Sequence, residues 1–234
     1  MASGAGLWAC DAFGGYRSRG RSIYAAEPDI RVRVRKNVPE TRIDGPMRMV
    51  VRPLGSSPRM VTGAITIKPS SAGLVLIESS GTESVLGMGV DVEVLPREMT
   101  AAERQAGEYY RPGDALNVDG STYPGFIVVT ASTNNAGLDV INVMPIETYL
   151  PGVLAKELFS NWPRQAFEVQ SVAARSYALH ERDRSRTARR TFDVEATTAD
   201  QAYGGLTSLP VAVEAVRATR GTILIDTPGG GGVL

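Results

Sequence analysis

The sequence predicts an α+β fold in which a β-rich first half, followed by a hairpin, packs with a helical core. Residues 30–36 alternate strictly between apolar and basic side chains, which is typical of a strand with one buried and one solvent-facing side. Short apolar runs separated by Gly, Ser and Pro continue to residue 95 and indicate antiparallel sheet. After residue 145 the apolar residues recur at helical spacing over two longer segments. Sheet therefore precedes helix along the chain.

The other strands of the first half are bounded by turn-forming residues. A short helix or a polar insertion is expected at 101–110, before a turn at 111–114. Strands at 123–130 and 138–143, joined by a turn at 134–137, form a hairpin that leads into the helical segments. Four further strands are expected before residue 100, at 48–52, 64–68, 74–78 and 90–95.

Two helices follow the hairpin. The first is expected to begin at about residues 148–149, because Pro151 then falls in the first turn, where proline removes no bonded donor. Residues 161–163, Asn-Trp-Pro, break this run and start the second helix, which extends over about 164–184. Its broad apolar arc predicts a central position in the core. Residues 211–224 predict a further helix and strand.

Composition limits the function. The chain has 25 basic and 25 acidic residues, so no net charge steers the whole molecule toward nucleic acid, and a nucleic-acid partner is not expected. No apolar run approaches the roughly 18 residues that a membrane-spanning helix needs. The single cysteine, Cys10, and the single histidine, His180, argue against a disulfide framework and against a metal site. We therefore expect no metal and no cofactor.

Glu157 is an acidic residue on an apolar helix stripe. It lies three, four and seven residues after Leu154, Val153 and Leu150, positions that share one face of a helix with about 3.6 residues per turn. Burial of an ionised carboxyl costs several kcal/mol unless the group is paired or protonated. The position therefore indicates either a structural ion pair or a tuned acid.

Arg175 is the expected partner of Glu157. Small and apolar residues flank it on the second helix, so its guanidinium requires a nearby anion or a bound ligand. Such a pair is structural about as often as it is catalytic. The other acidic residues have lesser expected roles, as surface or capping charges (Glu147 and Glu168) and as fallback second carboxylates (Asp200 and Glu195).

Several motifs in the second half of the chain resemble the SpoIID/LytB domain family. The resemblance covers about residues 123–224 and includes Trp162-Pro163. Its longest motifs are Asn-Val-Met-Pro-Ile-Glu-Thr-Tyr-Leu-Pro-Gly-Val-Leu-Ala-Lys-Glu at 142–157, Gln-Ser-Val-Ala-Ala-Arg-Ser-Tyr-Ala-Leu at 170–179 and Asp-Gln-Ala-Tyr-Gly-Gly at 200–205.

The resemblance implies work on bacterial peptidoglycan, in one of two ways. Sporulation stage II protein D is a lytic transglycosylase that acts on glycan strands already stripped of their peptide stems, whereas LytB-type relatives are described as noncatalytic enhancers of a cell-wall amidase. The transglycosylase motif implies Glu157 as the catalytic acid and gives Arg175 an important role. The substrate-binding residues expected from the matching motifs are Gln170, Tyr177, Gln201 and Tyr203.

The chemistry of a lytic transglycosylase suits a single carboxyl group. Cleavage of the β-1,4 bond between N-acetylmuramic acid and N-acetylglucosamine requires protonation of the leaving oxygen, and a partly apolar site keeps a carboxyl protonated near neutral pH. Most glycosidases add a second carboxylate, but here the muramyl 6-hydroxyl attacks and Glu157 accepts its proton. Arg175 either holds Glu157 in place or binds the lactyl carboxylate. Direct pairing would favour charged Glu157 and oppose its role.

The expected organisation has three parts: a disordered N-terminus or tether at 1–28, a β-rich region at 29–120 and the SpoIID/LytB-like domain at 121–234. Residues 6–10, Gly-Leu-Trp-Ala-Cys, partly resemble the end of a bacterial lipoprotein signal, but only nine residues precede Cys10 and none is Lys or Arg. A lipid anchor at Cys10 is therefore one alternative and a plain disordered N-terminus is the other, and an extracytoplasmic place in the cell envelope is expected. The family continues into a Ser-Gly-Gly type motif, whereas this chain stops at residue 234. We therefore expect a domain truncated at its C-terminus, with reduced or absent activity.

Overall fold

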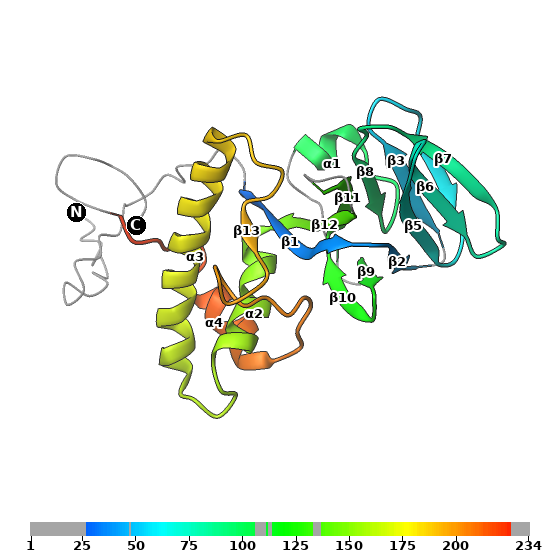
Figure 1. Ribbon diagram of the computed structural model, residues 1–234. Coiled ribbons are helices and arrows are strands. Elements are labelled where there is room, and N and C mark those ends of the chain that lie inside the picture. The colour runs from blue at the N-terminus through cyan, green and yellow to red at the C-terminus, as the bar shows by residue number, and fades with distance from the viewer. Residues whose placement is uncertain (1–26, 47, 106–110, 112–113, 133–136, 226–234) are drawn as a thin grey trace.

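Two β-sheets and a group of helices make up the computed structural model, which describes residues 27–46, 48–105, 111, 114–132 and 137–225. The predicted α+β class is confirmed. The three longer helices gather at one end of the molecule, beside the strands near residue 30 and residue 140, and the β-rich first half extends away from them (Figure 1). The expectations for the N-terminal tether, for Cys10 and for the chain end after residue 225 lie outside the described residues.

The larger sheet has seven strands in the order β13-β1-β12-β11-β8-β3-β4. Neighbouring strands are antiparallel except for β1 and β13, which pair in parallel through Val32 and Val194. The sheet combines strands from both sides of residue 120. Its members are β1 (Asp29–Val38), β3 (Met49–Pro53), β4 (Arg59–Val61), β8 (Val92–Leu95), β11 (Phe126–Ala131), β12 (Leu138–Pro145) and β13 (Val194–Glu195).

The smaller sheet has six antiparallel strands in the order β10-β9-β2-β5-β6-β7. The sequence predicts β5 and β6 but not β2, β7 or β9, which have only four or five residues each. The members are β2 (Thr41–Asp44), β5 (Ile65–Ser70), β6 (Gly73–Glu78), β7 (Glu83–Gly87), β9 (Ala115–Val118) and β10 (Ser121–Pro124).

The predicted strand at 123–130 is divided by Gly125 into β10 and β11, which belong to different sheets. Gly125 has a φ of 80°, and a Cβ at this position would lie 2.2 Å from the carbonyl oxygen of Val143. Only glycine combines this backbone conformation with such a close approach. The hairpin of β11 and β12 is confirmed, and β12 is buried along its whole length.

The alternating pattern predicts that the arginines of β1 face solvent. The structure shows instead that two of them form ion pairs within the protein. The alternation itself is present. Arg31 forms an ion pair with Asp193 at 2.6 Å, and Arg33 pairs with Asp139 at 2.7 Å and with Glu195. These partners belong to β12, to β13 and to the segment just before β13, so the charges hold β1 to its two neighbours.

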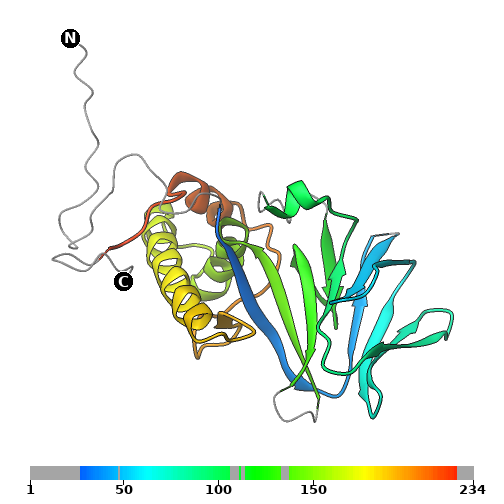
Figure 2. The ribbon, with the colours of Figure 1, turned by 90° about the horizontal axis from the view of Figure 1, so that it is seen from above.

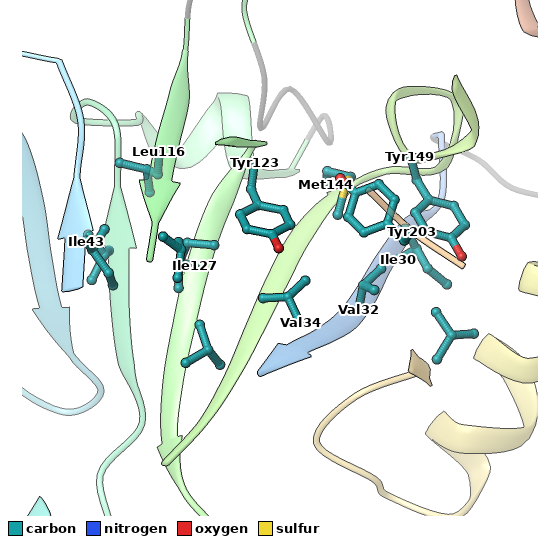
Figure 3. Close-up of a cluster of buried hydrophobic side chains, with 14 of the residues drawn as sticks. Ile30, Val32, Val34, Ile43, Leu116, Tyr123, Ile127, Met144, Tyr149 and Tyr203 are labelled. Carbon is teal, nitrogen blue, oxygen red and sulfur yellow. The ribbon is translucent and has the colours of Figure 1, made fainter. Parts of the chain in front are cut away.

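The main core connects both sheets to the helices. Ile43 and Leu116 of the smaller sheet share one buried cluster with Ile127 of the larger sheet and with Tyr149 of the helical region, as Figure 3 shows. A second cluster, which includes Phe126 and residues of β3, β8 and β12, covers the other face of the larger sheet. The larger sheet is therefore enclosed on both faces.

Of the three longer helices, the first two lie against the end of the larger sheet formed by β13, β1 and β12 and the third packs on those two; Figure 2 shows all three together on one side of the strands. They are α2 (Ile146–Glu157), α3 (Arg164–Thr187) and α4 (Pro210–Ala218); the short α1 (Ala101–Gln105) lies in the first half. Helix α2 begins directly after β12, earlier than predicted, with Pro145 as its N-cap residue. Among the described residues, no helix combines the length and apolarity needed to cross a membrane.

Candidate functional site

Arg175 pairs with Glu147 and not, as predicted, with Glu157. Its Nε and Nη2 atoms donate to the two carboxylate oxygens of Glu147 at 2.9 and 2.8 Å. The side chain of Arg175 is 1% exposed and that of Glu147 is 9% exposed. The expectation that Glu147 is a surface or capping charge is therefore wrong, because the early start of α2 places it in the first turn, facing α3.

The same ion pair holds the segment that follows α4. Nη1 of Arg175 donates to the carbonyl oxygen of Thr222 at 3.0 Å, and the backbone N–H of Gly221 donates to Glu147 Oε1 at 3.1 Å. Ser176 adds a contact nearby, since its hydroxyl oxygen accepts from the N–H of Leu224 at 2.8 Å. Arg175 and Glu147 thus connect α2, α3 and the chain after α4.

Glu157 is the last residue of α2 and is half-buried. Its neighbours on the predicted stripe, Leu150, Val153 and Leu154, are fully buried. Oε2 of Glu157 accepts a hydrogen bond from Nε2 of Gln170 on α3 at 2.7 Å. Within the described part of the chain, no ion pair includes Glu157. The structure therefore gives this carboxyl a neutral partner.

Two tyrosines place further polar groups near this contact. The Tyr149 hydroxyl donates to Gln201 Oε1 at 3.1 Å, and the Tyr177 hydroxyl donates to Asp200 Oδ1 at 3.1 Å. Burial raises the pKa of Tyr149 well above its ordinary value, and the charges of Glu157 and Asp200 act in the same direction. Burial, together with Asp200, raises the pKa of Tyr177 to about 12. Both phenols are therefore neutral hydrogen-bond donors at physiological pH.

Tyr203 and Gln201 are buried next to Tyr149. The Tyr203 ring lies beside the Tyr149 ring (Figure 3), 4.9 Å away from centroid to centroid. The Tyr203 hydroxyl donates to Asn142 Oδ1 at 3.1 Å. Gln201 is also buried and donates from Nε2 to the carbonyl oxygen of Ala174 at 3.3 Å. Contact of these two side chains with substrate stays a prediction, because both are bonded within the protein.

The predicted site residues fall into two groups. Glu157 and Gln170 touch, and the loop at 200–203 adjoins them through Tyr149. Arg175 belongs to the separate buried cluster with Glu147. Of the two fallback carboxylates, Asp200 joins the first group, whereas Glu195 pairs with Arg33 of β1. Sequence reasoning missed Tyr149, although its place on the stripe of α2 gives a signal.

The loop at 203–205 lies so close to α2 that a helix residue must be glycine. A Cβ on Gly152 would lie 2.3 Å from the carbonyl oxygen of Gly205 and 2.6 Å from the Tyr203 ring. We predict that Gly152→Ala lowers the free energy of unfolding by about 1–3 kcal/mol, despite the better helix propensity of alanine. Urea unfolding measures this. Gly81→Ala is the comparison without a clash, since a Cβ there meets nothing within 4 Å; its φ of 85° adds a backbone cost that helical Gly152 does not have. A Gly152→Ala protein as stable as the parent would contradict the prediction.

The shifted tyrosines predict a stability that falls in alkali. The folded-state pKa of Tyr177, about 12, lies above its ordinary value of 10.0, so its stabilising effect is complete below about pH 10 and is lost as the pH rises to about 12. We expect the free energy of unfolding to decrease over this range, and to decrease less steeply in Tyr177→Phe. Denaturant unfolding at a series of pH values tests this, with tyrosinate absorbance as a direct readout. Equal slopes for the two proteins would argue against it.

The described residues contain no group of three or more His, Cys, Asp and Glu side chains placed to hold a metal ion. The carboxylates near the site are instead engaged with amide, phenol and guanidinium donors, as in the pairs of Glu157, Asp200 and Glu147.

Comparison with known proteins identifies the helical part. Residues 134–225 match the family model described as SpoIID, stage II sporulation protein. An uncharacterized protein of Brachyspira hyodysenteriae (strain ATCC 49526 / WA1) is 33% identical over 120 residues, which cover 51% of this chain and 32% of that relative. The chain thus spans about a third of that relative's length. No solved structure matches. The chain therefore carries a SpoIID domain, which includes β12, α2, α3 and α4 and belongs to a family associated with sporulation.

Proposed function

We propose that the SpoIID domain cleaves the β-1,4 bond between N-acetylmuramic acid and N-acetylglucosamine in peptidoglycan glycan strands, as a lytic transglycosylase. Glu157 is the acid and then the base. The observation that carries the proposal is the neutral partner of Glu157: Gln170 donates to it at 2.7 Å, whereas Arg175 is engaged with Glu147. The objection that a guanidinium would keep Glu157 charged is thereby removed.

The reaction needs one carboxyl group and the substrate's own hydroxyl. Protonated Glu157 donates to the glycosidic oxygen as the bond from this oxygen to muramyl C1 breaks. The muramyl 6-hydroxyl oxygen then bonds to C1, and its proton returns to Glu157. The products are a 1,6-anhydromuramyl end and a free hydroxyl on N-acetylglucosamine, and no water is consumed. Because proton and nucleophile come from Glu157 and the substrate, this route uses no cofactor.

Gln170 orients the acid in this proposal. In the described structure it bonds Oε2 of Glu157, which leaves Oε1 to meet the glycosidic oxygen. Tyr149, whose pKa is raised by burial and then by the charges of Glu157 and Asp200, lines the same region as a neutral group. Gln170 and Tyr149 thus give Glu157 uncharged neighbours.

Arg175 is a positioning residue in this proposal, not a substrate ligand. Its side chain is 1% exposed, so binding of a lactyl carboxylate would require the pair with Glu147 to open. The pair instead fixes the start of α2 against α3. Glu157 and Gln170 lie on the same two helices, nearer to the connection between them. Arg175 thus acts on the acid through the helix geometry.

Analysis of the reaction products tests the proposal. Purified glycan strands, intact and peptide-stripped, are incubated with the protein and with Glu157→Gln, and the products are analysed by mass spectrometry. We expect 1,6-anhydromuramyl ends from the stripped strands with the parent protein only. Absence of such ends from both substrates would overturn the enzyme proposal, and stimulation of a cell-wall amidase by the protein would then support the enhancer function.

Because the proposed substrate lies outside the cytoplasm, we propose that the protein acts in the cell envelope and has a cell-wall amidase as a further partner. We propose that Cys10 carries a lipid anchor, because residues 6–10 resemble the end of a lipoprotein signal. Metabolic labelling with a fatty acid, compared between the parent and Cys10→Ser, tests the anchor. Equal labelling of both proteins would contradict it.

A further inference from the structure

Two large aromatic side chains are exposed in the connection between α2 and α3, the yellow-green loop at the foot of α3 in Figure 1. Phe159 is 71% exposed and Trp162 is 46% exposed. Their ring centroids are 5.8 Å apart and their planes are tilted by 56°. Neither ring contributes to the core clusters, so the fold does not account for their size or their position.

The connection has a defined conformation. The backbone N–H of Trp162 donates to the carbonyl oxygen of Phe159 at 3.0 Å, and Pro163 forms the N-cap of α3 with a fixed φ of −63°. Each ring also contacts the other. The aromatic pair is therefore held in place before any ligand binds, which reduces the entropy lost on binding.

The aromatic pair lies close along the chain to both residues of the contact between Glu157 and Gln170. Phe159 follows Glu157 by two residues, and Trp162 precedes the first turn of α3. Gln170 lies six residues after Arg164, the first residue of α3. The two residues are therefore about 9 Å apart along the helix axis, at a rise of 1.5 Å per residue. A short run of linked sugars covers such a distance.

We propose that Phe159 and Trp162 form a stacking surface for pyranose rings of the glycan strand, next to the bond that is cleaved. The inference rests on the proposed function, since it takes the Glu157 region as a glycan site. The C–H groups on one face of a pyranose ring carry partial positive charge and fit the negative face of an aromatic ring, while the sugar's hydroxyl and acetamido groups keep contact with water. An exposed aromatic pair therefore binds a sugar chain without a deep pocket.

The stacking surface assigns binding, not chemistry, to the two rings. Loss of one ring should weaken glycan binding by about tenfold. It should leave the rate at saturating glycan within about twofold, because Glu157 and Gln170 are untouched. The expected signature is a raised KM with an unchanged kcat.

Calorimetric titration with peptide-stripped glycan strands tests the inference in the Glu157→Gln background, which prevents cleavage. The variants are Phe159→Ala and Trp162→Ala, with Met60→Ala on β4 as the matched control, since Met60 is a 55% exposed apolar side chain far from the helices in the fold. A further arm uses Trp8→Phe, which leaves Trp162 as the single tryptophan of the chain. Its fluorescence should change when glycan is added.

The outcomes separate this inference from the proposed function. Weaker binding in both aromatic variants, with Met60→Ala unchanged, supports the stacking surface even if the parent protein releases no anhydro ends. Release of anhydro ends with Kd and KM unaltered by loss of either ring overturns the stacking surface and leaves the enzyme intact. A parent protein that binds no glycan, or a Trp162 fluorescence that does not respond, also overturns it.

Discussion

Replacement of Arg175 by methionine is expected to lower the free energy of unfolding by about 3–5 kcal/mol, because it leaves the buried carboxylate of Glu147 without its cation. The carbonyl oxygen of Thr222 loses a donor as well. Most of the loss comes from the unpaired charge, not from the attraction within the pair. Urea unfolding of the parent and the variant measures the effect.

The partner variants show whether the pair is the cause. Glu147→Leu combined with Arg175→Met should be closer to the parent than Arg175→Met alone, since an apolar pair of similar volume leaves no buried charge. Lys68→Met is the surface control: Lys68 and Glu83 are 3.3 Å apart, with side chains 38% and 58% exposed, and such pairs contribute about 0–1 kcal/mol. A loss below about 1 kcal/mol in Arg175→Met would contradict the structure of this cluster.

Glu157→Gln is expected to reduce kcat for glycan cleavage by about 10²- to 10⁴-fold, the usual contribution of a general acid or base. KM should change little, because the side chain keeps its size and its ability to bond Gln170. Rates of 1,6-anhydromuramyl release over a range of glycan concentrations separate the two constants. A kcat reduced by less than tenfold would remove Glu157 from the catalytic role.

Gln170→Leu tests the orienting contact separately. It removes the donor at 2.7 Å from Glu157 and keeps a branched side chain of comparable size, so kcat should fall by less than in Glu157→Gln. Glu168→Gln is the control on the same helix, where Glu168 forms an exposed pair with Arg164. Equal activity of Gln170→Leu and the parent would show that the contact does not position the acid.

The order of strands and helices follows from periodicity, and the errors have local causes. The alternation in β1 and the apolar arc of α3 predict the two elements that meet in the helical region. The sequence predicts a single strand at 123–130, whereas the structure has two strands in different sheets. Periodicity does not show that the chain turns at Gly125. The missed strand β2 has only four residues, too few for a clear pattern.

In the site, the sequence predicts one contact correctly and assigns the wrong partner to Arg175. The sequence places Glu157 on the inward stripe of α2 and Gln170 in the matching motif, and the structure brings the two together. The predicted start of the first helix left Glu147 outside it, as a surface charge. Because α2 begins at Ile146, Glu147 faces α3 and takes the guanidinium of Arg175 that the sequence assigned to Glu157. An error of two to three residues at a helix end thus led to the wrong predicted partner for a buried charge.

The strand order at the helical end affects how this domain is cut for expression. Residues 134–225, the extent of the family match, contain β12 and β13, but β1, which lies between them, comes from residues 29–38. A fragment trimmed to the match would lack β1 and also β11, the other neighbour of β12, so both edges of β12 would be bare, a known route to aggregation. A soluble recombinant piece should therefore include β11 and carry residues 27–38, covalently attached or added as a separate peptide.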